Sequence, residues 1–161
     1  MKKYITLILT ILCLTTCKDQ AVFPNSELQT ESDTDYIIFG HFYGFCLGER
    51  CIEIFKLTNT SLLEDTNDFY PSSQEAYDGA YVSVEQSKFN KLKDIKFEIP
   101  DELLNETEKV IGTPDAADGG GIYIELPDGR YWLLDMNEYY LPEYLHPLRE
   151  QIRAAIAKIS E

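Results

Sequence analysis

The chain has 161 residues, which is enough for about one domain. Hydrophobic residues make up 44% of it and charged residues 26%, an ordinary globular composition that excludes a disordered or fibrous chain. Its 14 Lys and Arg residues against 28 Asp and Glu residues give a formal net charge of −14. Because nucleic-acid phosphates require a basic surface, this charge argues strongly against a nucleic-acid partner.

The first segment has the pattern of an export signal. A short basic start is followed by residues 4–14 (YITLILTILCL), an apolar stretch well short of the ~20 residues that span a bilayer. With Leu14-Thr15-Thr16-Cys17 behind it, residues 1–17 resemble a bacterial lipoprotein precursor. The resemblance implies that residues 1–16 are removed and that Cys17 carries diacylglyceryl and fatty-acyl groups such as palmitate. Thr16 departs from the usual Gly, Ala or Ser, so a secretory signal with an incidental Cys17 is the alternative.

The lipid would be the protein's attachment to the membrane. Without Lys2 and Lys3 the mature chain keeps 12 basic and 28 acidic residues, and its net charge of −16 repels anionic headgroups. Residues 17–34 are then the lipidated Cys and a polar tether, with one domain at 35–161. Lys18-Asp19 is similar to the export signal of some surface lipoproteins. We expect the protein in the cell envelope, on the outer membrane, at the periplasmic face or the cell surface.

The domain should begin with a β-hairpin. Residues 36–46 and 51–57 are rich in aromatic and β-branched residues, and a short segment containing Gly joins them. A register with Cys46 opposite Cys51 pairs Phe42 with Phe55 and Gly40 with Leu57. It places Ile38, Phe42, Phe55 and Leu57 on one face of the hairpin, and Phe39, Tyr43, Phe45, Ile52 and Ile54 on the other.

The rest of the chain predicts short elements and one clear helix. Residues 58–73 are typical of a loop, and a strand at 80–82 should lead into a capping box at Ser83–Gln86 that opens a helix to about residue 94. A helical turn with Pro at its first position is expected at 100–104, and a hairpin at 122–126 and 131–135. A helix from Pro147 carries an apolar stripe: Leu141, Leu145, Leu148, Ile152, Ile156 and Ile159. The predicted class is α+β, with antiparallel hairpins in one sheet and this amphipathic helix packed on it.

The cysteine count favours a disulfide. Once Cys13 leaves with the signal and Cys17 is acylated, Cys46 and Cys51 remain as a pair in an oxidising compartment. The alternative is a soft-metal site formed by both cysteines and His41, which lacks a fourth ligand. No Gly-x-Ser-x-Gly motif accompanies His41 or His146. We therefore expect no catalysis and no cofactor.

Acidic residues cluster in three places: 64–68, 115–118 and 135–138. Calcium binding is one interpretation, but none of the clusters has EF-hand spacing, and solvated acidic loops are the simpler one. Tyrosine is frequent near the final helix, and Tyr139, Tyr140 and Tyr144 are predicted to form a partly exposed binding patch.

Most of the domain is similar to a family of small uncharacterised lipoproteins of diderm bacteria. The resemblance rests on residues 36–57, the stretch 114–121 (PDAADGGG) and Leu141-Pro142-Glu143-Tyr144-Leu145, and it implies no activity. The segment from Asp118 to the final helix is also loosely similar to emfourin-type peptidase inhibitors. We therefore expect a membrane-anchored lipoprotein with a non-catalytic domain that binds a protein or glycan partner. A peptidase-inhibitor-like or immunity-like protein is the alternative, and a small carboxylate-dependent glycan-acting enzyme is the third.

Overall fold

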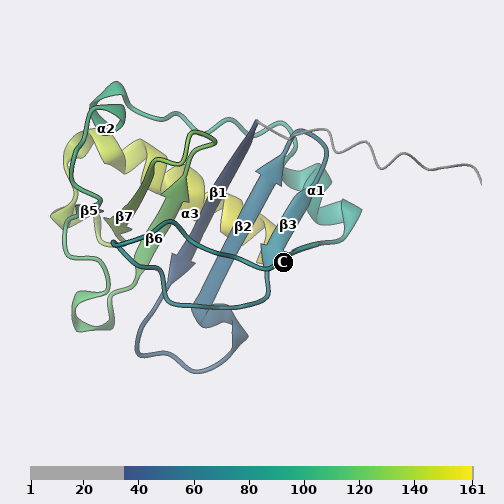
Figure 1. The fold of residues 1–161 in the computed structure, drawn as a ribbon, viewed down its shortest axis with the longest axis horizontal. Coiled ribbons are helices and arrows are strands. Elements are labelled where there is room, and N and C mark those ends of the chain that lie inside the picture. The colour runs from purple at the N-terminus through teal and green to yellow at the C-terminus, as the bar shows by residue number, and fades with distance from the viewer. Residues whose placement is uncertain (1–34, 161) are drawn as a thin grey trace, which may run out of the picture. The chain divides into compact units, whose positions relative to one another are not determined.

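The computed structural model describes residues 35–160, which form an α+β domain around one seven-stranded sheet (Figure 1). The predicted signal peptide, Cys17 and the tether lie outside the described residues. The strand order is β4-β3-β2-β1-β6-β7-β5, and every neighbouring pair is antiparallel except β5 and β7. The strands are β1 (Tyr36–Phe42), β2 (Ile52–Thr58), β3 (Leu62–Asp65), β4 (Tyr81–Ser83), β5 (Val110–Ile111), β6 (Gly121–Glu125) and β7 (Tyr131–Asp135).

The C-terminal helix packs against one face of this sheet, as the apolar stripe predicts. A 3₁₀ turn, η4 (Glu143–Leu145), leads directly into α3 (His146–Ser160), one residue before the expected start at Pro147. All six stripe residues are buried. The other helices, α1 (Gln86–Leu92) and α2 (Asp101–Leu104), are short. Further 3₁₀ turns are η1 (Glu49–Cys51), η2 (Ala116–Asp118) and η3 (Glu138–Tyr140).

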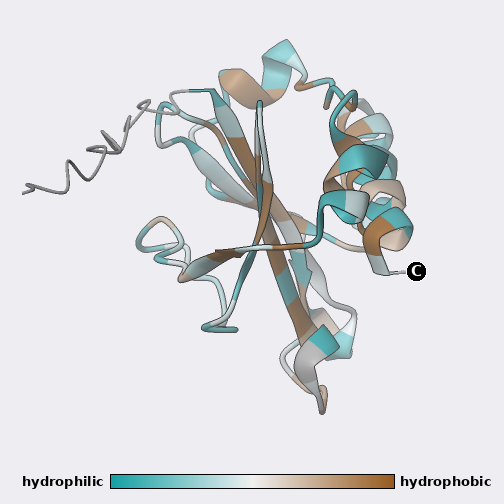
Figure 2. Cartoon of the chain, turned by 90° about the vertical axis from the view of Figure 1, so that its right-hand side faces the viewer, coloured by the Kyte–Doolittle hydropathy of each residue, from teal (hydrophilic) through white to brown (hydrophobic). Residues whose placement is uncertain are grey.

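Apolar side chains are buried on both faces of the sheet. Phe39, Ile122 and Trp132 belong to the larger cluster, which includes the buried apolar residues of α3. On the opposite face, Ile38, Phe42 and Tyr123 form a smaller cluster against which Tyr77 and Tyr81 pack. Figure 2 shows α3 on one side of the sheet and loop segments on the other. The sheet is therefore a central layer, which explains the apolar residues on both faces of its strands.

The predicted register of the first hairpin is wrong by three residues. Phe42 pairs with Ile52 and Gly40 with Ile54, where Phe55 and Leu57 were expected. Because side chains alternate along a strand, an odd shift reverses the face of every residue on β2. Phe55 and Leu57 therefore join Phe39 in the larger cluster, and Ile54 joins Ile38 and Phe42. The strands separate earlier than expected because the connecting loop covers 43–51, not only the four residues between the cysteines.

Several local predictions also need correction. The segment 58–73 contains β3, and β5 was not anticipated; both strands are too short to show a period. The capping box does not form, because Ser83 is the last residue of β4 and Glu85 is the N-cap of α1. Pro100 is likewise the N-cap of α2 and not its first residue. The second hairpin is confirmed, and its turn uses Gly129 at a positive φ of 83° that favours glycine.

Candidate functional site

Four loops leave the sheet at the same end. β1 ends where β2 begins, β3 ends beside the start of β4, and β6 begins where β7 ends, because these pairs are antiparallel. β5 runs parallel to β7, so its last residue lies at this end too. The segments 43–51, 66–80, 112–120 and 136–140 therefore all leave the sheet at this end, where the loop between β1 and β2 is the lowest part of Figure 1. We call this end of the sheet the loop end.

An aspartate in each acidic cluster holds these loops in place. The first is Asp65, which is only 4% exposed. Its carboxylate accepts hydrogen bonds from the backbone N–H groups of Asn67, Asp68 and Ala80, at 3.2, 2.9 and 2.6 Å, and from the Tyr77 hydroxyl at 2.6 Å. One side chain thus fixes both ends of the 66–80 loop, which crosses the face of the sheet opposite α3. The interpretation of this cluster as a solvated loop is wrong for Asp65.

Asp115 joins three different loops. Its Oδ2 accepts from the Gly44 N–H at 2.8 Å and from the Tyr70 hydroxyl at 3.0 Å, and its Oδ1 accepts from the Gly120 N–H at 3.1 Å. Asp115 and Ala117 have φ values of 60° and 50°, a left-handed conformation that costs about 1–2 kcal/mol per residue without glycine. Because the surrounding contacts must stabilise this conformation, the loop is held in one arrangement.

Asp135 is the third of these residues and is buried at 4% exposure. It accepts from the backbone N–H groups of Thr113 and Asn137, at 2.9 and 2.7 Å, and from the Thr113 hydroxyl at 3.1 Å. We call Asp65, Asp115 and Asp135 the pinning aspartates. In residues 35–160 no group of three or more His, Cys, Asp or Glu side chains could hold a metal ion. All three carboxylates accept backbone N–H bonds from loop residues, and these bonds fix the loops.

A tyrosine network fastens the 66–80 loop to the sheet. The buried Tyr123 donates its hydroxyl to Glu125 at 2.5 Å and accepts from the backbone N–H of Tyr77 at 2.9 Å. Burial, with the hydrogen bond to Glu125, raises the pKa of Tyr123, and burial also raises the pKa of Glu125. For Tyr77, burial and the hydrogen bond to Asp65 raise the pKa. The 66–80 loop is therefore held on this face of the sheet by hydrogen bonds in which protonated tyrosine hydroxyls donate to carboxylates.

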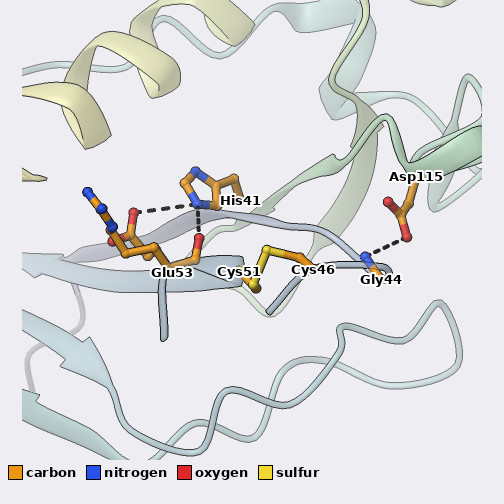
Figure 3. Close-up of a disulfide and its surroundings, with 7 residues drawn as sticks. His41, Gly44, Cys46, Cys51, Glu53 and Asp115 are labelled. Carbon is orange, nitrogen blue, oxygen red and sulfur yellow. Dashed lines mark hydrogen bonds and ion pairs between the residues drawn. A yellow bond between two sulfur atoms is a disulfide. The ribbon is translucent and has the colours of Figure 1, made fainter. Parts of the chain in front are cut away.

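The predicted disulfide is present in the loop between β1 and β2. Cys46 and Cys51 are bonded, with their Cα atoms 5.6 Å apart (Figure 3). Since both sulfurs are engaged, the alternative of a soft-metal site with His41 is wrong. The His41 imidazole instead lies 3.1 Å from the carbonyl oxygen of Arg50 and 3.4 Å from Glu53. The disulfide and His41 both hold the loop close to the start of β2.

Large apolar side chains project from the loops at this end. Phe45 is 85% exposed and Leu47 is fully exposed, and they flank Cys46 in sequence. Phe69 and Tyr70 are also exposed, and the Tyr70 ring contacts the buried Phe42. We call Phe45, Leu47, Phe69 and Tyr70 the apolar tips. Asp115 binds both Gly44, next to Phe45, and Tyr70, so it links the two loops that carry the tips.

The predicted tyrosine patch is only partly gathered. Tyr139 and Tyr140 lie in η3 at the loop end, both exposed, with their ring centroids 5.3 Å apart. Tyr144 is half-buried and packs against the core beneath α3. Sequence reasoning missed the apolar tips. The strand predicted at 36–46 assigned Phe45 to a face of the hairpin, but β1 ends at Phe42 and Phe45 lies in the exposed loop. The available signal was a Phe and a Leu on either side of a cysteine in a segment that also contains Gly44 and Gly48.

No protein-family model, no curated protein and no solved structure compared with the chain matches it. None of the helices in residues 35–160 has the length and apolar character needed to cross a membrane. The fold and site define a small α+β domain with fixed loops and exposed apolar side chains at one end of its sheet.

Proposed function

We propose that this protein is a lipid-anchored, non-catalytic binding protein that docks a protein partner on its loop end. The observation that carries the proposal is the group of apolar tips held by Asp115 and by the Cys46–Cys51 disulfide. Exposed aromatic and aliphatic side chains on fixed loops are typical of binding surfaces, because ordering them on binding costs little entropy. A protein partner is favoured because the tips are apolar and project outward from the loops.

The second candidate function is that of an inhibitor-like or immunity-like protein. In that case the docked partner is a peptidase or a toxin enzyme. One observation favours it. The disulfide-closed loop presents Phe45 and Leu47 from a short constrained segment, a shape suited to entering a partner's active site. The loose similarity to emfourin-type inhibitors supports the same candidate, although the similar segment, from Asp118 onward, does not include this loop.

The anchor itself is tested by fatty-acid labelling. Cells that produce the full chain are grown with an alkyne analogue of palmitate, and the protein is probed for the alkyne. The wild-type chain should be labelled and the Cys17→Ala chain should lose nearly all of the label, because the lipobox cysteine is the proposed acylation site. Cys13→Ala, which changes the other cysteine of the same segment, is the matched control and should keep the label. Equal labelling of Cys17→Ala and wild type would exclude lipidation at this position.

The docking surface is tested by photo-crosslinking in the same cells. Benzoylphenylalanine at Phe45 or Leu47 should give one discrete adduct with a second protein. The same group at Asp128, in the β6–β7 turn at the other end of the sheet, should give none. With the probe at Phe69, the change Leu47→Asp should weaken the adduct by an order of magnitude or more, since a central apolar contact contributes about 2 kcal/mol. Equal adducts at positions 45 and 128 would argue against a specific loop-end surface.

A further inference from the structure

A groove lies beside the loop end, between the end of the first hairpin and the last turns of α3. Its volume is about 380 Å³. His41 and Glu53, which are cross-strand neighbours on β1 and β2, form part of its wall together with Arg50 of the disulfide loop. Arg153 and Ile156 line it from α3, and their spacing places them on one side of that helix. The groove therefore combines apolar side chains with charged groups from β2, the disulfide-closed loop and α3.

The charges in this groove differ from those of the rest of the chain. Arg50 and Arg153 both line it, in a protein that has twice as many acidic as basic residues. Among the described side chains, Arg50 forms no ion pair, and the ion pair of Arg153 is with the exposed Glu150 at 3.2 Å. The guanidinium of Arg50 is thus available to a carboxylate, the anion that it binds with paired hydrogen bonds. The ion pair of Arg153 is exposed and contributes little to stability, so a bound carboxylate can replace Glu150 there.

The acidic residue of the groove is already engaged. His41 Nε2 lies near two acceptors, the carbonyl oxygen of Arg50 and the carboxylate of Glu53, so this nitrogen carries the proton (Figure 3). His41 therefore acts as a positioning residue, because it holds the backbone of Arg50 and contacts the carboxylate of Glu53, the acidic group among the described residues that line the groove. The backbone of Arg50 is also held because the next residue, Cys51, is bonded to Cys46.

We propose that the groove binds a carboxylate-bearing peptide segment of the protein partner, with the carboxylate between Arg50 and Arg153 and an apolar neighbour against Ile156. This inference rests on the proposed function, because Arg50 lies in the same loop as Phe45 and Leu47, so one partner would contact both surfaces. The net charge of −14 opposes a long acidic segment, which favours a single carboxylate. That carboxylate is either an acidic side chain or a peptide C-terminus.

Three short peptides test the proposal by NMR on the ¹⁵N-labelled full chain in detergent. Acetyl-Ala-Leu-Glu-amide carries a side-chain carboxylate, acetyl-Ala-Leu-Ala carries a C-terminal one, and acetyl-Ala-Leu-Gln-amide carries none. At least one of the first two should give saturable shifts at the amides of Arg50, Arg153 and Ile156, and the better of them identifies the source. The Gln peptide should bind at least tenfold more weakly, and the affinity should fall with added salt.

Arginine variants complete the test. Arg50→Gln and Arg153→Gln should each weaken binding of the better peptide about tenfold or more. Arg130→Gln, at the exposed β6–β7 turn, is the matched control and should leave it unchanged. All three side chains are on the surface, so dispersed spectra should confirm the fold. Equal binding of the Gln peptide, an equal effect of Arg130→Gln, or no saturable shift would overturn the groove proposal. If the groove proposal fails but crosslinked adducts still form at Phe45, the proposed function stands without the groove. If the peptides bind but no adducts form at Phe45, the groove proposal stands and the proposed function fails.

Discussion

Replacing Asp65 by Ala should lower the free energy of unfolding of the domain by about 3–5 kcal/mol, because several donors lose their acceptor at once. The Asp65 carboxylate accepts from three backbone N–H groups and from the Tyr77 hydroxyl, and it is 4% exposed. In the variant these donors remain partly buried, and each unsatisfied buried donor costs about 1–3 kcal/mol. Urea unfolding followed by circular dichroism measures the difference.

The matched control for this change is Asp78→Ala. Asp78 belongs to the same loop and is exposed, and its backbone carbonyl, which the substitution keeps, accepts a hydrogen bond from Asn67. Its replacement should change stability by less than about 0.5 kcal/mol. Asp65→Asn keeps the size of the side chain but exchanges one acceptor oxygen for a donor, so its loss should lie between the two. If Asp65→Ala were as mild as Asp78→Ala, the acidic cluster would be a solvated loop after all.

Elements whose signals are local could be predicted from the sequence. The apolar stripe of α3 and the Pro-Asp-Gly turn of the β6–β7 hairpin are such signals, and the structure agrees with both predictions to within a residue or two. β5 has only two residues and obtains its definition from pairing with β7, which no local pattern reveals. The register of the first hairpin failed for a related reason. A disulfide constrains only its own two residues. The pairing of β1 with β2 ends at Phe42 and Ile52, so the cysteine pair does not set the strand register.

The candidate site shows the same division between local and long-range information. Cys46 and Cys51 could be paired from sequence because they are close together in a short loop. The acidic residues could be located but not interpreted, since a solvated carboxylate and one that accepts buried N–H groups have the same sequence. Asp115 contacts Gly44 and Tyr70, which are 71 and 45 residues away in the chain. Only the fold brings them together, and with them the apolar tips.

Raising the pH above 10 should unfold the domain more steeply than exposed tyrosines alone would allow. Burial is the largest cause of the raised pKa values of Tyr123, Tyr77 and Tyr81, and burial with the hydrogen bond to Asp115 raises the pKa of Tyr70 to about 12. In the unfolded chain a tyrosine has a pKa of about 10. Between pH 10 and the folded pKa, the unfolded state therefore holds fewer protons than the folded state, and stability falls as the pH rises.

Urea unfolding at several pH values between 8.5 and 11.5 tests this link between tyrosine ionisation and stability, and a substitution at Tyr123 isolates the contribution of one residue. A tyrosine that stays protonated in the fold contributes about 1.4 kcal/mol per pH unit to the slope above pH 10. Tyr123 is completely buried, so Tyr123→Phe should lower the stability at pH 8.5 through its lost hydrogen bonds but reduce the alkaline slope by about that amount. Tyr139→Phe, which removes an exposed phenol, is the matched control. Parallel stability–pH curves for wild type and Tyr123→Phe would show that Tyr123 ionises without unfolding, and that the loop over this face opens to solvent at high pH while the sheet beneath it persists.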